Sequence, residues 1–186
     1  MDNIKVFVVT GLPRSGKDTV MDWVKLHAKA NVIKLSMVDP AKEILTERDL
    51  WDENNKTPES RKCLFELKNL LDKYYNYSYN WIDEQIRLQR DHLDCIGYEF
   101  YPLVVLICSK EVEDIKYLKE KYNANVICID DNGVRSGKLE ISNSADRILD
   151  EIRNTELVDY YILNISTTEV LYDRTKNVFE KMGVGF

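Results

Sequence analysis

Short apolar runs alternate with amphipathic stretches along the whole chain. A run that is short, continuous and rich in β-branched and aromatic residues is typical of a buried strand. The runs that fit this description are IKVFVVT, NVIKLS, YPLVVLIC, NVICID and DYYILNI, at residues 4–10, 31–36, 101–108, 125–130 and 159–165. We expect the most continuous of them, YPLVVLIC, to be a central strand of the sheet.

The stretches between these runs have apolar residues at helical spacing, such as Val20 and Val24 in the first of them. Leu64, Leu67, Leu70 and Leu71 are likewise expected to share one helix face. The predicted helices cover residues 17–29, 39–49, 57–75, 81–93, 111–122, 145–154 and 168–182. Residues 51–57 and 131–138 are predicted loops, the second of them mobile, and residues 76–80 a break between helices.

Strands that alternate with helices predict an α/β fold with three layers, a parallel sheet with helices on both faces. No linker is long enough to divide the chain, so we expect one domain over residues 1–186. Within it, residues 51–94 form a helical region, and residues 131–143 a short loop. The oligomeric state is left open, a homodimer included.

Composition and charge narrow the class of protein. The 186 residues are 44% hydrophobic and 31% charged, enough apolar material for a core, and the net charge is −6. This charge disfavours nucleic-acid polymers and anionic membranes as partners. The cysteines form no C-x-x-C pair, which favours buried thiols in a reducing compartment; they are Cys63, Cys95, Cys108 and Cys128. The N-terminus lacks a signal-peptide pattern, so we expect a cytoplasmic protein.

The segment GLPRSGKDT directly follows the first predicted strand and fits the pattern G-x-x-x-x-G-K. Glycines allow the backbone to turn tightly against a phosphate, a lysine reaches the β and γ oxygens, and the next helix contributes its N-terminus. This strand–loop–helix context predicts a phosphate-binding loop for a nucleotide. Its candidate residues are Gly11, Pro13, Arg14, Ser15, Gly16, Lys17, Asp18 and Thr19.

Two positions of this loop are unusual. The Ser or Thr that commonly follows the lysine is replaced by Asp18, with Thr19 next. Asp18 and Thr19 are candidate Mg²⁺ ligands, since hard cations prefer oxygen, although Asp18 also suits a helix N-terminus. Arg14 either neutralises charge on the β and γ phosphates, as a catalytic residue beside Lys17 and Asp18, or is a solvated loop residue.

The string RSGKDT resembles the phosphate loop of phage-type deoxynucleoside monophosphate kinases, and animal-type phosphomevalonate kinases have a similar S-G-K-D. LSMVDPAKEIL resembles the family's D-P-x-K-E segment, and SRKCLFELKNLLDKYY its arginine-bearing substrate helix. DYYILNIST resembles its final strand, which ends in Asn. The resemblance implies a P-loop kinase fold, ATP and Mg²⁺ as cofactors, and small-molecule nucleotides as partners. It also implies that the helical region at residues 51–94 binds the acceptor and that the loop at residues 131–143 is a short lid.

The chain departs from that family at two places. The third strand of the family commonly ends in Asp-x-Arg, whereas this chain has Cys108-Ser109-Lys110. Asp130 and Asp131 either replace that acid in space or form a solvated turn. The lid also has fewer cations than the family pattern, because only Arg135 and Lys138 are available there, with Arg135 a candidate contact to the nucleotide.

An acceptor that carries a phosphate needs cations. Asp39 and Lys42 are one turn apart after the second strand, and either contact the acceptor or form a local pair. Arg61 is the first candidate for the acceptor's phosphate because a guanidinium binds it bidentately, and Arg87 is a further candidate; both also suit a solvated helix face.

The aromatic residues from Tyr74 to Trp81 either stack on a base or pack between helices. The leading hypothesis is ATP-dependent phosphorylation of a (deoxy)nucleoside monophosphate to the diphosphate. The alternatives are another phosphomonoester as acceptor, similar to phosphomevalonate or dephospho-coenzyme A, and a nucleotide-binding module with impaired catalysis.

Overall fold

The computed structural model describes residues 4–97, 102–132 and 156–186. The chain divides into two compact units, one of Met1–Lys34 and Tyr98–Phe186 and the other of Leu35–Gly97. The first unit contains the sheet except for Leu35 and Ser36, and the second contains the predicted acceptor region at residues 51–94. Among the described residues, no helix is both long and apolar enough to cross a membrane.

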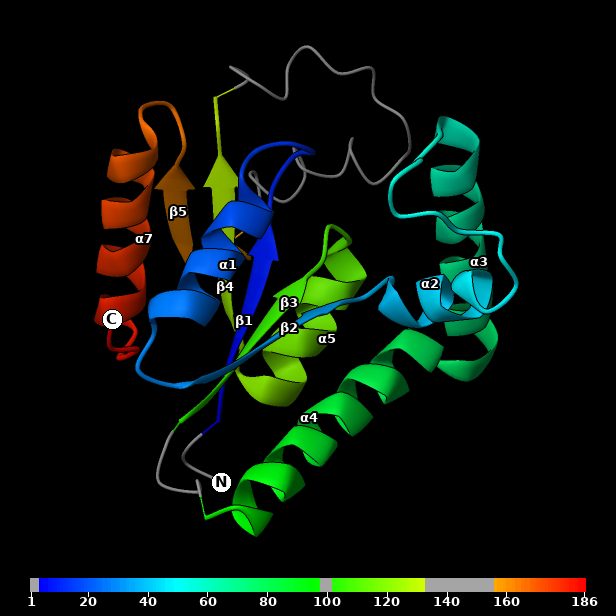
Figure 1. The fold of residues 1–186 in the computed structure, drawn as a ribbon, viewed down its shortest axis with the longest axis horizontal. Helices are drawn as coiled ribbons and strands as arrows, with labels where there is room; N and C mark the ends of the chain where they lie inside the picture. The colour runs from blue at the N-terminus through cyan, green and yellow to red at the C-terminus, as the bar shows by residue number, and fades with distance from the viewer. Residues whose placement is uncertain (1–3, 98–101, 133–155) are drawn as a thin grey trace. The chain divides into compact units, whose positions relative to one another are not determined.

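Five strands form the sheet, in the order β2-β3-β1-β4-β5 (Figure 1). Their bounds are Ile4–Thr10 for β1, Asn31–Ser36 for β2, Leu103–Cys108 for β3, Asn125–Asp130 for β4 and Tyr160–Leu163 for β5. β1 pairs in parallel with β3 and β4, and β4 pairs in parallel with β5. β1 is therefore central, and the chain leaves its carboxyl end directly into the glycine-bearing loop.

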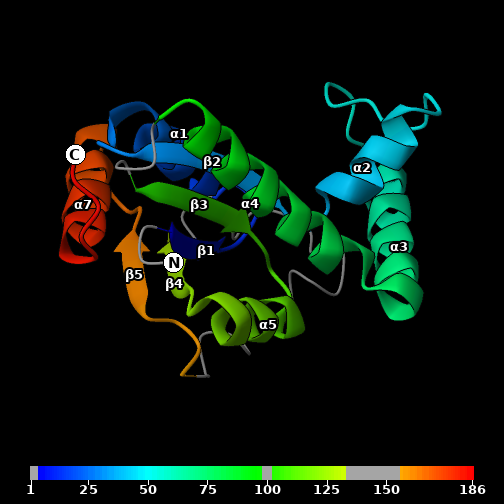
Figure 2. The same cartoon turned by 90° about the horizontal axis from the view of Figure 1, so that it is seen from below.

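Helices cover both faces of this sheet. On one side, α1 (Lys17–His27) and α7 (Thr168–Lys181) share a buried cluster with Phe7 and Val9 of β1. The rings of Phe7 and Phe179 lie 5.1 Å apart. α5 (Val112–Tyr122) lies on the opposite side (Figure 2). Because neighbouring β1 residues alternate in direction, a strand covered twice must be apolar throughout, which explains its unbroken hydrophobic run.

The second unit is helical. It contains α2 (Asp39–Thr46), α3 (Pro58–Tyr75) and α4 (Tyr77–Cys95). Thr57 caps α3, because its side-chain oxygen accepts a hydrogen bond from the Ser60 amide at 3.1 Å. Pro58 occupies the first turn of α3, where its missing N–H group is not needed. The small core of this unit consists of Ala41, Leu45, Trp51 and Leu64.

The structure confirms the predicted parallel α/β architecture and the strands at residues 4–10, 31–36 and 125–130. The predicted break at residues 76–80 is wrong. Only Asn76 leaves the helical conformation, with φ of 50°, and α4 begins at the next residue. Asparagine tolerates this left-handed conformation, so a single residue is enough to turn the chain.

Other predictions about exposure are also corrected. Leu70 is 56% exposed rather than part of the apolar face of α3. Cys63 and Cys95 are exposed free thiols, whereas Cys128 is buried as expected. The predicted helix at residues 145–154, the candidate nucleotide contact Arg135 and its neighbour Lys138 lie outside the described residues.

A buried ion pair lies on the face of α3 that was expected to be apolar. The ammonium of Lys68, whose side chain is 3% exposed, lies 3.1 Å from the carboxylate of Asp72, which is 11% exposed. Asp72 also accepts a hydrogen bond from the Ser78 amide in the first turn of α4, at 2.7 Å. The carboxylate therefore joins the end of α3 to the start of α4, and Lys68 compensates its charge.

Candidate functional site

The loop between β1 and α1 requires both of its glycines. Gly11 has φ of 143°, and a Cβ atom there would lie 2.4 Å from the carbonyl oxygen of Ile129 in β4. Gly16 has φ of 102°, and a Cβ atom there would lie 2.6 Å from Nδ2 of Asn164. Side chains at these two positions are excluded both by backbone conformation and by neighbouring atoms, so the loop lies close against the sheet.

Lys17 lies over the loop that precedes it. Its side chain is only 7% exposed, and Nζ donates hydrogen bonds to the carbonyl oxygens of Gly11, at 2.8 Å, and Leu12, at 2.6 Å. The Ser15 amide also donates to Leu12, at 3.1 Å, and closes the turn. The ammonium group is thus held at the loop by the backbone itself, in a position from which it can serve a bound phosphate.

Two hydroxyl groups at this loop are buried without a hydrogen-bond partner. They belong to Thr10, the last residue of β1, and Ser15, and both side chains are 0% exposed. Buried polar groups are nearly always satisfied in proteins. In addition, Gly16 caps α1 without a side-chain hydrogen bond, which leaves the first amides of this helix to other acceptors. These features fit an anionic ligand that supplies oxygen atoms to the loop.

Asn164 fixes the loop to the far end of the chain. Its side-chain amide donates to the carbonyl oxygen of Ser15 at 2.8 Å, and its backbone amide donates to Asp130 at 2.7 Å. The residue is 2% exposed and follows β5 directly. From the sequence this asparagine was recognised only as the end of a strand. Its hydrogen bond to the loop between β1 and α1 was missed, since 149 residues separate the two partners.

Of the other candidate residues of the loop, Pro13 is half-buried, and Arg14, Asp18 and Thr19 are exposed. Asp18 and Thr19 lie in the first turn of α1. Arg14 adopts a left-handed conformation with φ of 63°, and its guanidinium has no partner among the described residues. All three side chains are therefore available to a ligand without breaking a contact inside the described part of the protein.

The acidic residues near the loop are arranged differently from the Asp-x-Arg that ends the third strand in the family that the chain resembles. Ser109, just after β3, donates from its hydroxyl to the carboxylate of Asp114 at 2.9 Å, and both are buried. The acid at this end of β3 therefore comes from α5, which the sequence analysis missed. At the end of β4, Asp130 accepts from the Asn132 amide, and Asp131, directly after the strand, is fully buried. Among the described residues, no group of three or more His, Cys, Asp or Glu is arranged to hold a metal.

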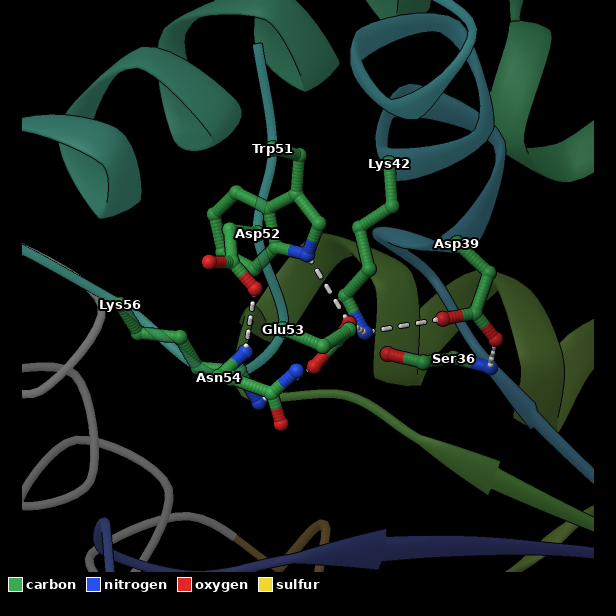
Figure 3. A network of polar contacts seen from close by, with 8 residues as sticks. All are labelled: Ser36, Asp39, Lys42, Trp51, Asp52, Glu53, Asn54 and Lys56. Carbon is green, nitrogen blue, oxygen red and sulfur yellow. Dashed lines mark hydrogen bonds and ion pairs between the residues drawn. The ribbon is translucent and has the colours of Figure 1, made fainter. Parts of the chain in front are cut away.

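In the second unit, the predicted pair of Asp39 and Lys42 belongs to a larger polar network (Figure 3). The Asp39 carboxylate accepts from the Ser36 amide at 2.7 Å and from Lys42 at 3.2 Å. Lys42 also lies 3.6 Å from the carboxylate of Glu53, in the loop that follows α2. Lys42 is therefore positioned by two carboxylates, one of which was not predicted.

Glu53 is the centre of this network. It accepts a hydrogen bond from Nε1 of Trp51 at 2.9 Å and pairs with Lys56 at 2.6 Å (Figure 3). These contacts lower the pKa of Glu53 from its ordinary value of 4.5 to about 2. The largest cause is the hydrogen bond from Lys56, and the hydrogen bond from Trp51 and the positive charge of Lys42 contribute further. The carboxylate is thus charged throughout the neutral and mildly acidic range.

This shift predicts a pH dependence. Because folding lowers the pKa of Glu53, its contribution to stability is present above the unfolded value near 4.5 and is lost as pH falls towards about 2. Thermal unfolding midpoints measured between those pH values are expected to fall more steeply in the wild type than in Glu53→Gln. Parallel curves for the two proteins would contradict the role of Glu53.

The two candidate arginines differ in their surroundings. Arg61, in the first turn of α3, is exposed, and its guanidinium has no partner within the described ranges. Arg87 donates to Glu84 at 2.6 and 2.8 Å and to Asp91 at 2.9 Å, all on α4. Arg61 is available to an acceptor as it stands, whereas Arg87 already forms ion pairs within its helix.

The aromatic segment is only partly a packing feature. Tyr74, Tyr75 and Tyr77 are exposed, with exposed fractions of 64%, 68% and 38%, so the expectation that they pack between helices is wrong for these three. Trp81 donates from Nε1 to the carboxylate of Glu43 at 3.2 Å.

No family model matches this chain, and no curated protein matches it either. Solved structures with a similar course of the chain include a dephospho-CoA kinase from Campylobacter jejuni, with 16% identity, a TM-score of 0.49, and coverage of 96% of this chain and 97% of that one. A tunicamycin resistance protein of Deinococcus radiodurans has 11% identity, a TM-score of 0.48, and coverage of 98% and 99%. A shikimate kinase from Acinetobacter baumannii has 13% identity, a TM-score of 0.44, and coverage of 97% and 94%.

Proposed function

We propose that this protein transfers the γ-phosphoryl group of ATP to a (deoxy)nucleoside monophosphate. The observation that carries the proposal is the loop between β1 and α1, in which the Ser15 hydroxyl is buried without a partner while Lys17 lies over the same turn. A buried hydroxyl, a lysine and an uncapped helix N-terminus together are the donor set that suits a triphosphate.

In this reaction an oxygen of the acceptor's phosphate attacks the γ-phosphorus of ATP, the bond from that phosphorus to the β–γ bridging oxygen breaks, and ADP leaves. The protein contributes positioning and positive charge rather than covalent chemistry. Lys17 and the loop amides stabilise the negative charge that grows on the bridging oxygen. Arg14, exposed at the same loop, adds a second cation for the γ-phosphate oxygens.

Mg²⁺ would be held through Asp18 and Thr19, the oxygen-bearing residues in the first turn of α1, together with phosphate oxygens and water. When bound, the ion neutralises charge on the β and γ phosphates. Asp130, the last residue of β4, and Asp131, directly after it, are further candidates for the surroundings of the ion, since Ile129 of the same strand lies against Gly11.

The acceptor is proposed to bind through cations of the second unit. Arg61 is the leading contact for its phosphate, because its guanidinium has no partner among the described residues and can form two parallel hydrogen bonds to phosphate oxygens. Lys42 is a second contact, with Asp39 fixing its direction. Arg87 is a weaker proposal, since acceptor binding there must compete with Glu84 and Asp91.

The direct experiment is an acceptor panel. The protein is incubated with ATP, Mg²⁺ and each deoxynucleoside and ribonucleoside monophosphate in turn, with phosphomevalonate and dephospho-coenzyme A as further acceptors, and ADP is measured. The proposal expects ADP formation that depends on one or a few monophosphates. Turnover with only phosphomevalonate or dephospho-coenzyme A contradicts the nucleotide acceptor and retains the kinase.

One observation favours a second candidate, a module that binds nucleotide without transferring phosphate. Cys108 ends β3 at the position where the resembling family has an acid, and the hydroxyl of the next residue, Ser109, is already bonded to Asp114. The same panel separates the candidates, because this module would bind ATP and release no ADP with any acceptor.

Arg61→Ala is expected to raise the KM for the acceptor by about tenfold or more and to leave the KM for ATP nearly unchanged. The reason is that a hydrogen bond to a charged group contributes about 1.5–3 kcal/mol. Steady-state kinetics with each substrate varied in turn measures both values. Lys62→Ala, at the next position and also exposed, is the control and should change neither. Equal losses for both substrates would contradict an acceptor role for Arg61.

A further inference from the structure

The Glu53 carboxylate lies among three donor groups that are suited to an anion. Its Oε1 accepts from Nε1 of Trp51 at 2.9 Å and lies 3.6 Å from Nζ of Lys42, and its Oε2 lies 2.6 Å from Nζ of Lys56 (Figure 3). We call Lys42, Trp51 and Lys56 the donor cluster. Two ammonium groups and an indole N–H that converge on one planar oxyanion form the same kind of donor set that binds a phosphate group.

Two members of the donor cluster are anchored more firmly than the carboxylate they surround. Trp51 is only 8% exposed and packs with Ala41 and Leu45 in the core of its unit. Lys42 belongs to α2 and is also held by Asp39, which in turn accepts from the Ser36 amide. These contacts do not involve Glu53, so Trp51 and Lys42 each keep an anchor of their own when the Glu53 carboxylate is displaced.

Glu53, in contrast, is easily displaced. Its side chain is 54% exposed and lies in the loop between α2 and α3, outside any helix or strand. Each exposed ion pair of this kind contributes only about 0.2–1 kcal/mol, so a ligand that offers the same donors more charge can displace the side chain into solvent. A phosphate group brings more charge and more acceptor oxygens than one carboxylate, and can therefore replace it.

We propose that the donor cluster is an anion subsite for the phosphate group of the acceptor, and that the Glu53 carboxylate fills this subsite until the acceptor displaces it. The proposal rests on the proposed function and deepens it, because it adds Trp51 and Lys56 to the acceptor contacts and makes Glu53 an internal competitor. Glu53 thereby screens the subsite against weakly charged compounds, since only an anion that outcompetes the carboxylate gains access to Lys42.

The test measures binding of inorganic phosphate by calorimetry, in the absence of ATP and of any acceptor. All proteins also contain Lys17→Ala, which weakens phosphate binding at the loop between β1 and α1. Glu53→Gln is expected to increase phosphate affinity about two- to fivefold, the range that loss of one competing exposed ion pair supports. Adding Lys42→Met to Glu53→Gln is expected to abolish the gain.

Glu113→Gln is the matched control. Glu113 forms the same kind of pair with a lysine three residues later, Lys116 at 2.9 Å, and its substitution changes the net charge by the same amount. It should leave phosphate affinity unchanged. An affinity that is unchanged or lower in Glu53→Gln, or a gain that survives Lys42→Met, overturns the proposal, as does an equal gain in Glu113→Gln.

The outcome is separable from that of the proposed function. A Lys42-dependent gain in phosphate affinity, together with no ADP formation in the acceptor panel, supports the anion subsite and contradicts the kinase. Turnover in the panel without any gain in Glu53→Gln retains the kinase and overturns the subsite. If the protein is a kinase and also has the anion subsite, Glu53→Gln in the otherwise wild-type protein lowers the KM for the acceptor and leaves the KM for ATP unchanged.

Discussion

Lys17→Ala is expected to reduce ATP-dependent phosphoryl transfer by at least about a hundredfold, the effect that loss of one preorganised charge-stabilising donor has in other enzymes. The ammonium lies at the loop in the unliganded protein, bonded to the carbonyl oxygens of Gly11 and Leu12, so its removal takes charge from the place where the transferred group must be stabilised. Initial rates of ADP formation at saturating ATP and acceptor measure the loss.

Lys25→Ala is the matched control, because Lys25 is on the same helix, at its last turn, and is exposed. It should retain the wild-type rate. Circular dichroism and thermal unfolding should show that both variants fold, since the strands and the core clusters do not depend on either ammonium. A Lys17→Ala protein that is folded and transfers phosphate at the wild-type rate would contradict the assignment of the loop.

The second large effect concerns stability. Lys68→Met is expected to lower the free energy of unfolding by about 3–5 kcal/mol, the usual cost of removing one partner of a buried ion pair. Asp72 would then keep a nearly buried carboxylate that still accepts from Ser78 but has lost its cation. Urea unfolding measures the change as a lower midpoint with an unchanged slope.

Lys62→Met provides the comparison within the same helix. Lys62 pairs with Glu66 four residues later, as Lys68 pairs with Asp72, but its side chain is 73% exposed and the two charged atoms are 3.8 Å apart. An exposed pair of this kind contributes about 1 kcal/mol or less. Similar losses of unfolding free energy in Lys62→Met and Lys68→Met would show that burial of the ion pair does not determine how much it stabilises the protein.

Much of the fold was predictable from the sequence because the sheet is buried on both faces. A strand such as Ile4–Thr10 cannot alternate apolar and polar residues when helices cover both of its sides, so a short unbroken run marks it. The conformation of the loop between β1 and α1 was predictable for a similar reason. Its glycines stand where a Cβ atom would meet Ile129 or Asn164, so the geometry leaves little choice of residue.

The polar networks were not predictable in this way. Lys68 interrupts the apolar face of α3 and would ordinarily be placed on the surface, because burial of a lysine depends on a partner that the hydrophobic pattern does not reveal. The segment around Glu53 suggested only a loop. The spacing of Glu53 and Lys56, three residues apart, is a weak signal, and their convergence with Lys42 depends on how α2 and the loop pack around Trp51.

Every other assignment depends on a triphosphate that binds at the loop between β1 and α1. Isothermal titration calorimetry of the wild-type protein with ATP and Mg²⁺ measures this binding. We expect a saturable heat of binding at one site per chain, and we expect this binding to be strongly reduced in Lys17→Ala. A folded wild-type protein that gives no heat with ATP or GTP, and no thermal stabilisation by either, would contradict it.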